Sequence, residues 1–464
     1  MFQAEVYIQR RKILCEKMGS GIVLFLGNQE SPMNYLDNTY HFRQDSSFLY
    51  YFGIDFPSLA AIIDVDNQRQ IIFGNDYTID DIVWMGPQPT IADRAIPSGI
   101  FETQPTQNLF SILKNAQKSG REIHFLPPYR SENTIRLQSY LHISAEEVTN
   151  HASTRLAKAV ISQREIKSAE EIIEIEKAVN LSVDMHIAAM KLARSGMRES
   201  HIAARVNEIA QEQDCTIAFP IIATINGQTL HNHSHHNILK EDDLFLLDAG
   251  AESAMHYAGD LSSTFPVSSR FTNIQKQIYQ ASLFAHEAAI QTIAPGIRFK
   301  DVHLAACLSI TNSMKELGLM KGDASEAVAA GAHALFFPCG TGHMMGLDVH
   351  DMEDLGEVWV GYNGEPKSTQ FGLKSLRMAK ELLPGHVFTI EPGIYFIPEL
   401  IDKWKSEGKF NDFLNWNEIE KFRNFGGIRN EEDFLVLETG YRRLGKEKPK
   451  TIAEVEMIRN SNLL

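Results

Sequence analysis

The sequence predicts an α/β protein that is divided into two domains. The chain has 464 residues, which is too many for one ordinary hydrophobic core. Its first third mixes short apolar runs, typical of buried strands, with helical stretches. After about residue 160, long helical patterns alternate with strands that carry acidic motifs. We therefore expect one domain over residues 1–160 and a second over residues 161–464.

Local patterns support both halves of this division. In the first, residues 21–28 form an apolar run typical of a buried strand, and residues 59–66 and 70–75 predict a hairpin. In the second, Ser168 followed by Glu171 is a capping-box signature, and apolar residues then recur at helical spacing. Further helical patterns lie near residues 199–213 and 272–294.

Charge and composition exclude some classes of function. The net charge of −15 argues against a nucleic-acid partner, which would require a basic face. The four cysteines are far apart and form no CxxC pair, a pattern typical of free thiols in a reducing compartment. We see no signal-peptide pattern and no apolar run of about 18 residues. We therefore expect a cytoplasmic protein without a membrane partner.

Acidic and histidine side chains stand on or beside several apolar strands, where ionisable groups are uncommon. Asp248 ends one such run, and Asp260 follows twelve residues later, so a hairpin can bring the two carboxylates together. Arg429 and Glu431 are expected on one face of a strand by period-two alternation. The candidates are Asp248, Asp260, His343, His350, Glu391, Arg429 and Glu431.

Each candidate alone has a plainer explanation, such as a turn residue or a buried histidine with a hydrogen-bond partner. The histidine-rich segment 231–236 is likewise typical of a flexible polar loop. Four gathered carboxylates, however, would repel one another and raise their pKa values. Two divalent cations would supply the missing positive charge. A donor set that consists mainly of oxygen atoms favours Mn²⁺, with Zn²⁺ or Co²⁺ as alternatives through the imidazole.

The motifs resemble the metallopeptidase family with the pita-bread fold, which includes methionine aminopeptidase, aminopeptidase P, prolidase and creatinase. The segments in the family's order are DAG at 248–250, GD at 259–260, GHMMGLDVHD at 342–351, TIEPGIYF at 389–396 and GGIRNEED at 426–433. HFRQDSSFLYYFGI at 41–54 resembles the N-terminal domain of the proline-directed branch. The resemblance implies an N-terminal creatinase-type α/β domain and a C-terminal α+β pita-bread catalytic domain.

Within this branch, the chain is more similar to prolidase than to aminopeptidase P. Aminopeptidase P lacks most of the residues inserted here between His350 and Glu431. Arg377 matches the prolidase arginine that binds the free carboxylate of a dipeptide, a task suited to a planar guanidinium. The resemblance thus implies hydrolysis of the Xaa–Pro bond in dipeptides, and a homodimer. Aminopeptidase P activity on longer peptides is the alternative, and a non-catalytic binding protein is a remoter one.

The resemblance also assigns roles to individual residues. Two metal ions would be held by Asp248, Asp260, His343, Glu391 and Glu431, with Asp260 and Glu431 bridging them and a bridging hydroxide attacking the substrate. Glu391 would be the general acid and base, and His231 and His350 would bind substrate and stabilise the oxyanion. Arg377 and Arg429 would border the substrate, and Arg429 would also orient the carboxylates.

Two positions depart from the family pattern. Cys339 stands where these peptidases usually have a substrate-binding histidine, and a thiol is the weaker donor. Ser263 stands where aminopeptidase P commonly has an arginine.

Overall fold

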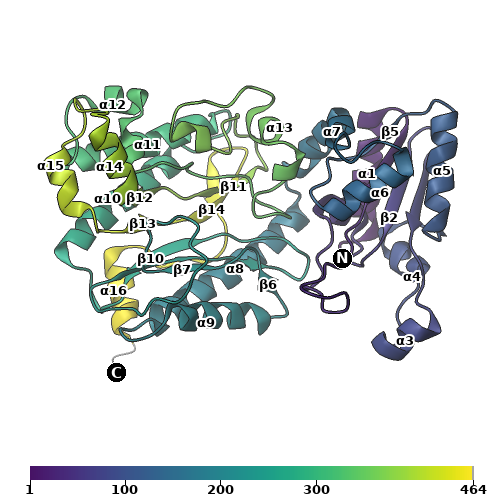
Figure 1. Cartoon of the computed structure of the whole chain (residues 1–464), viewed down its shortest axis with the longest axis horizontal. Helices are drawn as coiled ribbons and strands as arrows, with labels where there is room; N and C mark the ends of the chain where they lie inside the picture. Colours follow the sequence, from purple (N-terminus) through teal and green to yellow (C-terminus); the bar gives the residue numbers. More distant parts are fainter. Residues whose placement is uncertain (462–464) are drawn as a thin grey trace. The chain divides into compact units, whose positions relative to one another are not determined.

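The structure is a computed structural model in which residues 1–461 are described. The chain divides into two compact units (Figure 1). The first contains Met1–Arg164 and the short segment Glu353–Gly356, and the second contains Glu165–Met352 and the chain from Glu357 onward.

The first unit is built on a five-stranded mixed sheet in the order β4-β3-β2-β1-β5. Strands β1, β2 and β3 are antiparallel neighbours, whereas β5 and β4 run parallel to β1 and β3. The predicted hairpin is confirmed, with Asp64 paired to Arg69 at its turn. The strands are β1 (Ile22–Leu26), β2 (Ala60–Asp64), β3 (Arg69–Phe73), β4 (Thr103–Gln104) and β5 (Ile123–His124).

Helices cover both faces of this sheet. Because side chains alternate along each strand, neighbouring residues of a strand contact helices on opposite faces. Leu24 of β1 joins a buried core with Leu109 and Leu113 of α5. Phe25, its neighbour, contacts Tyr51 of α2, with ring centroids 5.1 Å apart. The helices are α1 (Ala4–Met18), α2 (Ser46–Phe52), α3 (Ile79–Met85), α4 (Ile91–Ala95), α5 (Gln107–Lys118), α6 (Ser131–Leu141) and α7 (Thr154–Arg164).

Long helices surround the strands of the second unit (Figure 1). The capping box predicted at the start of α8 is confirmed, since the Ser168 side chain accepts from the Glu171 amide and the Glu171 side chain accepts from the Ser168 amide. Two further predicted helices correspond to α9 and α10. The helices are α8 (Ala169–Leu192), α9 (Glu199–Gln211), α10 (Asn273–Gln291), α11 (Phe299–Glu316), α12 (Ala324–Ala330), α13 (Glu357–Tyr362), α14 (Pro398–Ser406), α15 (Trp416–Ile419) and α16 (Ile452–Asn460).

The strands of the second unit form small antiparallel sheets, in the orders β10-β8-β7, β11-β14-β15, β12-β13 and β6-β9. Their bounds are β6 (Thr216–Ile217), β7 (Ile222–Thr224), β8 (Leu244–Asp248), β9 (Ala251–Glu252), β10 (Ser262–Pro266), β11 (Val387–Ile390), β12 (Gly393–Tyr395), β13 (Gly427–Arg429), β14 (Glu432–Val436) and β15 (Tyr441–Arg443). The ends of β8, β11 and β13 carry candidate residues. Within residues 1–461, no helix is long and apolar enough to cross a membrane.

Candidate metal centre and substrate cavity

The first two carboxylates are brought together by the turn between β8 and β10. Asp248 is the last residue of β8 and pairs with Ser262 of β10. Within this turn, a Cβ atom added to Gly250 would lie only 1.7 Å from the carbonyl oxygen of Gly259. Only glycine permits so close an approach of two backbones. The turn therefore folds back on itself and places Asp260 near Asp248.

His343 and Glu391 are fixed by backbone contacts between neighbouring segments. Glu391 directly follows β11, and its amide donates to the carbonyl of Thr341 at 2.7 Å. The amide of Thr389 donates to the carbonyl of His343 at 3.0 Å. These bonds hold the loop that carries His343 against the end of β11.

We expected Glu431 within a strand, and this was wrong. Strand β13 pairs with β12 and ends at Arg429, whereas β14 pairs with β11 and begins at Glu432. Glu431 lies in the short link where the chain changes pairing partner. Its amide donates instead to the carbonyl of Ser262 at 3.1 Å, which places it beside the β8–β10 turn.

The donor atoms of Asp260, His343 and Glu431 all lie within 4.8 Å of one another. His343 Nε2 is 3.3 Å from Asp260 Oδ2 and 3.7 Å from Glu391 Oε1. His343 Nδ1 lies 3.0 Å from the carbonyl of Met344, which can only accept a hydrogen bond, so Nδ1 carries the proton. Burial lowers the pKa of His343. The lone pair of a neutral Nε2 therefore faces the carboxylates, as metal ligation requires.

Arg429 orients two of the carboxylates through hydrogen bonds. Its Nη2 donates to Asp248 Oδ2 at 2.6 Å, its Nη1 to the Tyr395 hydroxyl at 2.9 Å, and its Nε to Ser262 Oγ at 2.9 Å. Ser262 Oγ in turn donates to Glu431 Oε2 at 2.8 Å. One guanidinium thus fixes Asp248 directly and Glu431 through a hydroxyl.

Burial and mutual repulsion disfavour the charged forms of the carboxylates. Burial raises the pKa of Asp260 well above its usual value, and the charges of Asp248, Asp433 and Glu391 raise it further. Burial likewise raises the pKa of Glu431 well above its usual value, with added repulsion from Asp260 and Glu391. The pKa of Glu391 is also raised, chiefly by burial. Arg429 alone does not offset this repulsion.

These properties fit a pair of divalent cations. Asp248 Oδ1 and Asp260 Oδ1 are buried without a hydrogen-bond partner among residues 1–461, although buried carboxylate oxygens are normally paired. The five candidate ligands offer carboxylate oxygens and one imidazole, the donor types that divalent metals take. Cations would relieve the repulsion and satisfy both oxygens.

The nine residues that the sequence singled out for the site lie together around one cavity of about 570 Å³. These are His231, Asp248, Asp260, His343, His350, Arg377, Glu391, Arg429 and Glu431. The His350 ring lies edge-on to that of His343, with centroids 4.2 Å apart. Sequence reasoning missed an apolar wall of the cavity, to which Phe219, Pro220, Ile222, Leu230 and Val349 contribute.

Sequence reasoning also missed three polar residues that form hydrogen bonds with the site residues. Ser262 and Tyr395 accept hydrogen bonds from Arg429. Asp433 Oδ2 accepts from the amide of Asp260 at 3.2 Å. The acidic run NEED signalled that a second carboxylate follows Glu431, but no pattern in the sequence linked it to Asp260.

The two departures from the family pattern lie in different places. Cys339 lines the cavity, and burial followed by the charge of Glu391 raises its pKa to about 12, so the thiol is neutral. Ser263 Oγ instead contacts His186 Nδ1 at 2.9 Å and accepts from Lys448 Nζ at 3.0 Å. These contacts occupy the hydroxyl with structural partners.

Comparison with known proteins agrees with this geometry. The sequence model of metallopeptidase family M24 matches residues 174–438, and that of the aminopeptidase P N-terminal domain matches residues 7–124. The Xaa-Pro dipeptidase of Homo sapiens is 28% identical over 471 residues, covering 97% of this chain and 92% of that protein. A probable Xaa-Pro aminopeptidase of Aspergillus niger is 28% identical over 457 residues, covering 95% and 93%.

Solved structures show the same fold over nearly the whole chain. Pseudomonas aeruginosa aminopeptidase PepP superposes with a TM-score of 0.82 at 27% identity, covering 99% of this chain and 98% of that one. Zn-substituted Escherichia coli aminopeptidase P in complex with product gives a TM-score of 0.82 at 25% identity, with the same coverage. The expected creatinase-type N-terminal domain and C-terminal pita-bread domain are thereby confirmed. Because the family match spans more than half of the chain, the protein belongs to metallopeptidase family M24.

Proposed function

We propose that this metallopeptidase hydrolyses the Xaa–Pro bond of dipeptides, with residues 161–464 as its catalytic domain. The observation that carries this proposal is the position of Arg377, which lines the same cavity as the five candidate metal ligands. A guanidinium there can bind the carboxylate of a substrate that ends at proline. The relative named Xaa-Pro dipeptidase, which matches 97% of the chain, supports the same activity.

Asp248, Asp260, His343, Glu391 and Glu431 would hold two divalent ions. When bound, these ions would polarise the carbonyl before proline and activate a water molecule. We assign proton transfer to the Glu391 carboxyl, whose raised pKa suits a group that must both take and return a proton. This oxygen-rich set favours Mn²⁺, with Zn²⁺ or Co²⁺ as alternatives.

Other residues would recognise the substrate. A proline nitrogen carries no N–H and its ring is rigid, so selectivity depends on shape rather than on a hydrogen bond. The apolar wall that includes Phe219, Ile222 and Leu230 offers a surface for the substrate's apolar side chains. His231 and His350 lie at the same cavity, where their ring nitrogens can stabilise the developing oxyanion.

Aminopeptidase P activity on longer peptides is the second candidate. Solved aminopeptidase P structures superpose on 99% of the chain, so the fold accommodates that activity. The two candidates differ in whether the substrate chain continues beyond proline. If Arg377 binds the free carboxylate of proline, the substrate chain ends at that residue, whereas an aminopeptidase must accept a further residue on that side.

An assay of the Mn²⁺-loaded protein on Ala-Pro and Ala-Pro-Ala separates the candidates. We expect cleavage of the dipeptide only. Arg377→Ala should raise the KM for Ala-Pro about 10- to 100-fold at nearly constant kcat, because a charge-assisted bond is worth roughly 1.5–3 kcal/mol. The matched control is Lys374→Ala, which removes an exposed cation three residues away and should change neither constant. Cleavage of Ala-Pro-Ala at an equal or higher rate would instead identify an aminopeptidase P.

Two finer assignments complete the proposal. We propose a homodimer, supported by α3 of the first unit, where Ile79 is 75% exposed and Trp84 is 84% exposed. Such a patch of large apolar side chains is typical of an interaction surface. Light scattering of the wild type and of Trp84→Lys would test it, and a monomeric wild type would refute it. We also propose a cytoplasmic location, supported by four free cysteines.

A further inference from the structure

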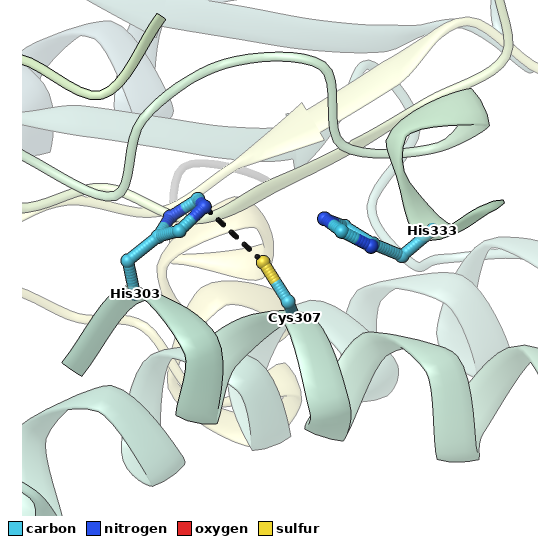
Figure 2. A group of neighbouring side chains, drawn as sticks. All are labelled: His303, Cys307 and His333. Atoms are coloured by element: carbon cyan, nitrogen blue, oxygen red, sulfur yellow. Dashed lines mark hydrogen bonds between the residues drawn. The ribbon is translucent and has the colours of Figure 1, made fainter. Parts of the chain in front are cut away.

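A second group of metal-binding side chains lies in the catalytic unit, apart from the carboxylate site. His303 and Cys307 are four residues apart on α11 and so share one face of that helix. His333 lies opposite them on the short 3₁₀ helix Ala332–Leu335. Figure 2 shows the His333 ring directed toward the sulfur atom of Cys307. All three side chains are buried, and their donor atoms lie within 4.8 Å of one another.

The spacing of His303 and Cys307 already suits a metal ion. His303 Nε2 lies 3.4 Å from Cys307 Sγ, the contact drawn in Figure 2. A tetrahedral Zn²⁺ with the usual bond lengths keeps a nitrogen and a sulfur ligand about 3.5 Å apart. His303 Nδ1 is 2.8 Å from the Thr341 hydroxyl, so a second hydrogen bond orients the ring, as is common for metal-binding histidines.

His333 is the independent sign of a missing ligand. The side chain is buried, yet neither Nδ1 nor Nε2 has a hydrogen-bond partner within residues 1–461. A buried imidazole that satisfies neither nitrogen is unusual, because each loses its hydrogen bonds to water without replacement. A metal ion bound between His333, Cys307 and His303 would give one of these nitrogens a partner.

We propose that His303, Cys307 and His333 form a structural Zn²⁺ site, separate from the catalytic pair. One thiolate and two imidazoles form a donor set that favours Zn²⁺ over hard cations, which prefer oxygen ligands. On binding, a bond forms between the metal and Sγ, the S–H bond breaks, and the proton leaves to solvent. Three protein ligands leave the fourth position to a water molecule.

The environment keeps these groups ready for a metal. Burial lowers the pKa of His303 to about 3 and that of His333 to about 4, so both imidazoles are neutral and can ligate. Burial raises the pKa of Cys307, so the thiol releases its proton to solvent only when a strong local cation stabilises the thiolate.

A zinc ion at this site would stabilise the segments next to the proposed catalytic ligands. It would tie α11 to the turn that contains His333. Through the His303–Thr341 bond it would also reach the loop that carries His343, since the Thr341 carbonyl accepts from the Glu391 amide. The site would therefore position two catalytic ligands without touching the substrate.

Co²⁺ substitution of the full-length protein tests the proposal without relying on activity. After removal of excess Co²⁺, we expect three ions per chain and a near-ultraviolet charge-transfer band between sulfur and cobalt. The five proposed catalytic ligands contain no sulfur, and a band from Cys339, which lines the catalytic cavity, would persist in Cys307→Ser. An Asp260→Ala/Glu431→Ala double variant should keep the band and one ion, which separates this test from the proposed peptidase site.

Variants identify the ligands. Cys307→Ser and His333→Gln should each remove one ion and abolish the band. Cys215→Ser, which alters a half-buried thiol elsewhere in the same unit, should leave both unchanged. A wild type with two ions and no band would refute the proposal even if the variants fail to fold. A band that persists in Cys307→Ser would refute it as well.

Discussion

Replacing Arg429 with lysine should weaken metal binding, although lysine keeps the positive charge. Arg429 is 3% exposed and donates to three acceptors, on Asp248, Ser262 and Tyr395. An ammonium group cannot reproduce this planar fork, so we expect about two of the three bonds to be lost. Alanine would be a poorer choice, because removal of a cation strengthens the attraction of the carboxylates for metal and hides the loss of orientation.

The size of the effect follows from these contacts. Two lost hydrogen bonds in a buried network correspond to about 2–3 kcal/mol in the free energy of unfolding. Loss of residues that orient metal ligands typically weakens metal affinity 10- to 100-fold, or about 1.4–2.8 kcal/mol. Asp248 would lose its direct partner, and Glu431 would lose the indirect one through Ser262.

Titration of the metal-free protein with Mn²⁺, followed by calorimetry, gives the affinity of wild type and Arg429→Lys. Urea unfolding of both metal-free proteins gives the stability difference. Lys421→Arg, an exposed exchange of the reverse kind, is a suitable control for the handling of both proteins. If Arg429→Lys bound Mn²⁺ within twofold of wild type, the guanidinium network would not be what orients the ligands.

Three other predictions concern pH, the departure at Cys339 and the ligand turn. Burial lowers the pKa of His186 to about 3, so between pH 6.5 and pH 3 the unfolded state binds a proton that the folded state does not, and the free energy of unfolding falls by about 1.4 kcal/mol for each unit by which the pH decreases. His186→Gln should make the pH dependence of urea unfolding shallower by one proton, and an unchanged slope would contradict this. Cys339→His should raise kcat/KM for Ala-Pro about tenfold by replacing a weak donor with a strong one, and no gain in steady-state assays would show that this position does not contact substrate. Gly250→Ala should lower the free energy of unfolding by at least about 3 kcal/mol and weaken Mn²⁺ binding, because the added methyl would collide with the Gly259 carbonyl. A variant with unchanged thermal or urea unfolding and normal affinity would count against the tight turn.

Local chemistry made much of the fold predictable. The hairpin in the first unit and the capping box at Ser168 depend on a few neighbouring residues, and both appear as expected. The nine candidate site residues converge on one cavity. Their order along the chain carried that information through the family resemblance.

Other features depend on which segments meet, and the sequence does not state this. Glu431 was expected to share a strand with Arg429 by period-two alternation, but a change of pairing partner places it in a link. The cluster of His303, Cys307 and His333 was missed because it joins a helix to a distant turn and contains no CxxC pair. Single histidines and cysteines carry no recognisable pattern until the chain folds.

The wide separation of the ligands along the chain also bears on how the enzyme folds. Asp248 and Asp260 are joined by a short turn, whereas Glu391 and Glu431 reach them only after long loops have closed. Contacts between residues so far apart form late and slowly. We therefore expect dissolved metal ions to leave the early refolding phases unchanged and to slow unfolding, because the complete ligand set exists only in the native state.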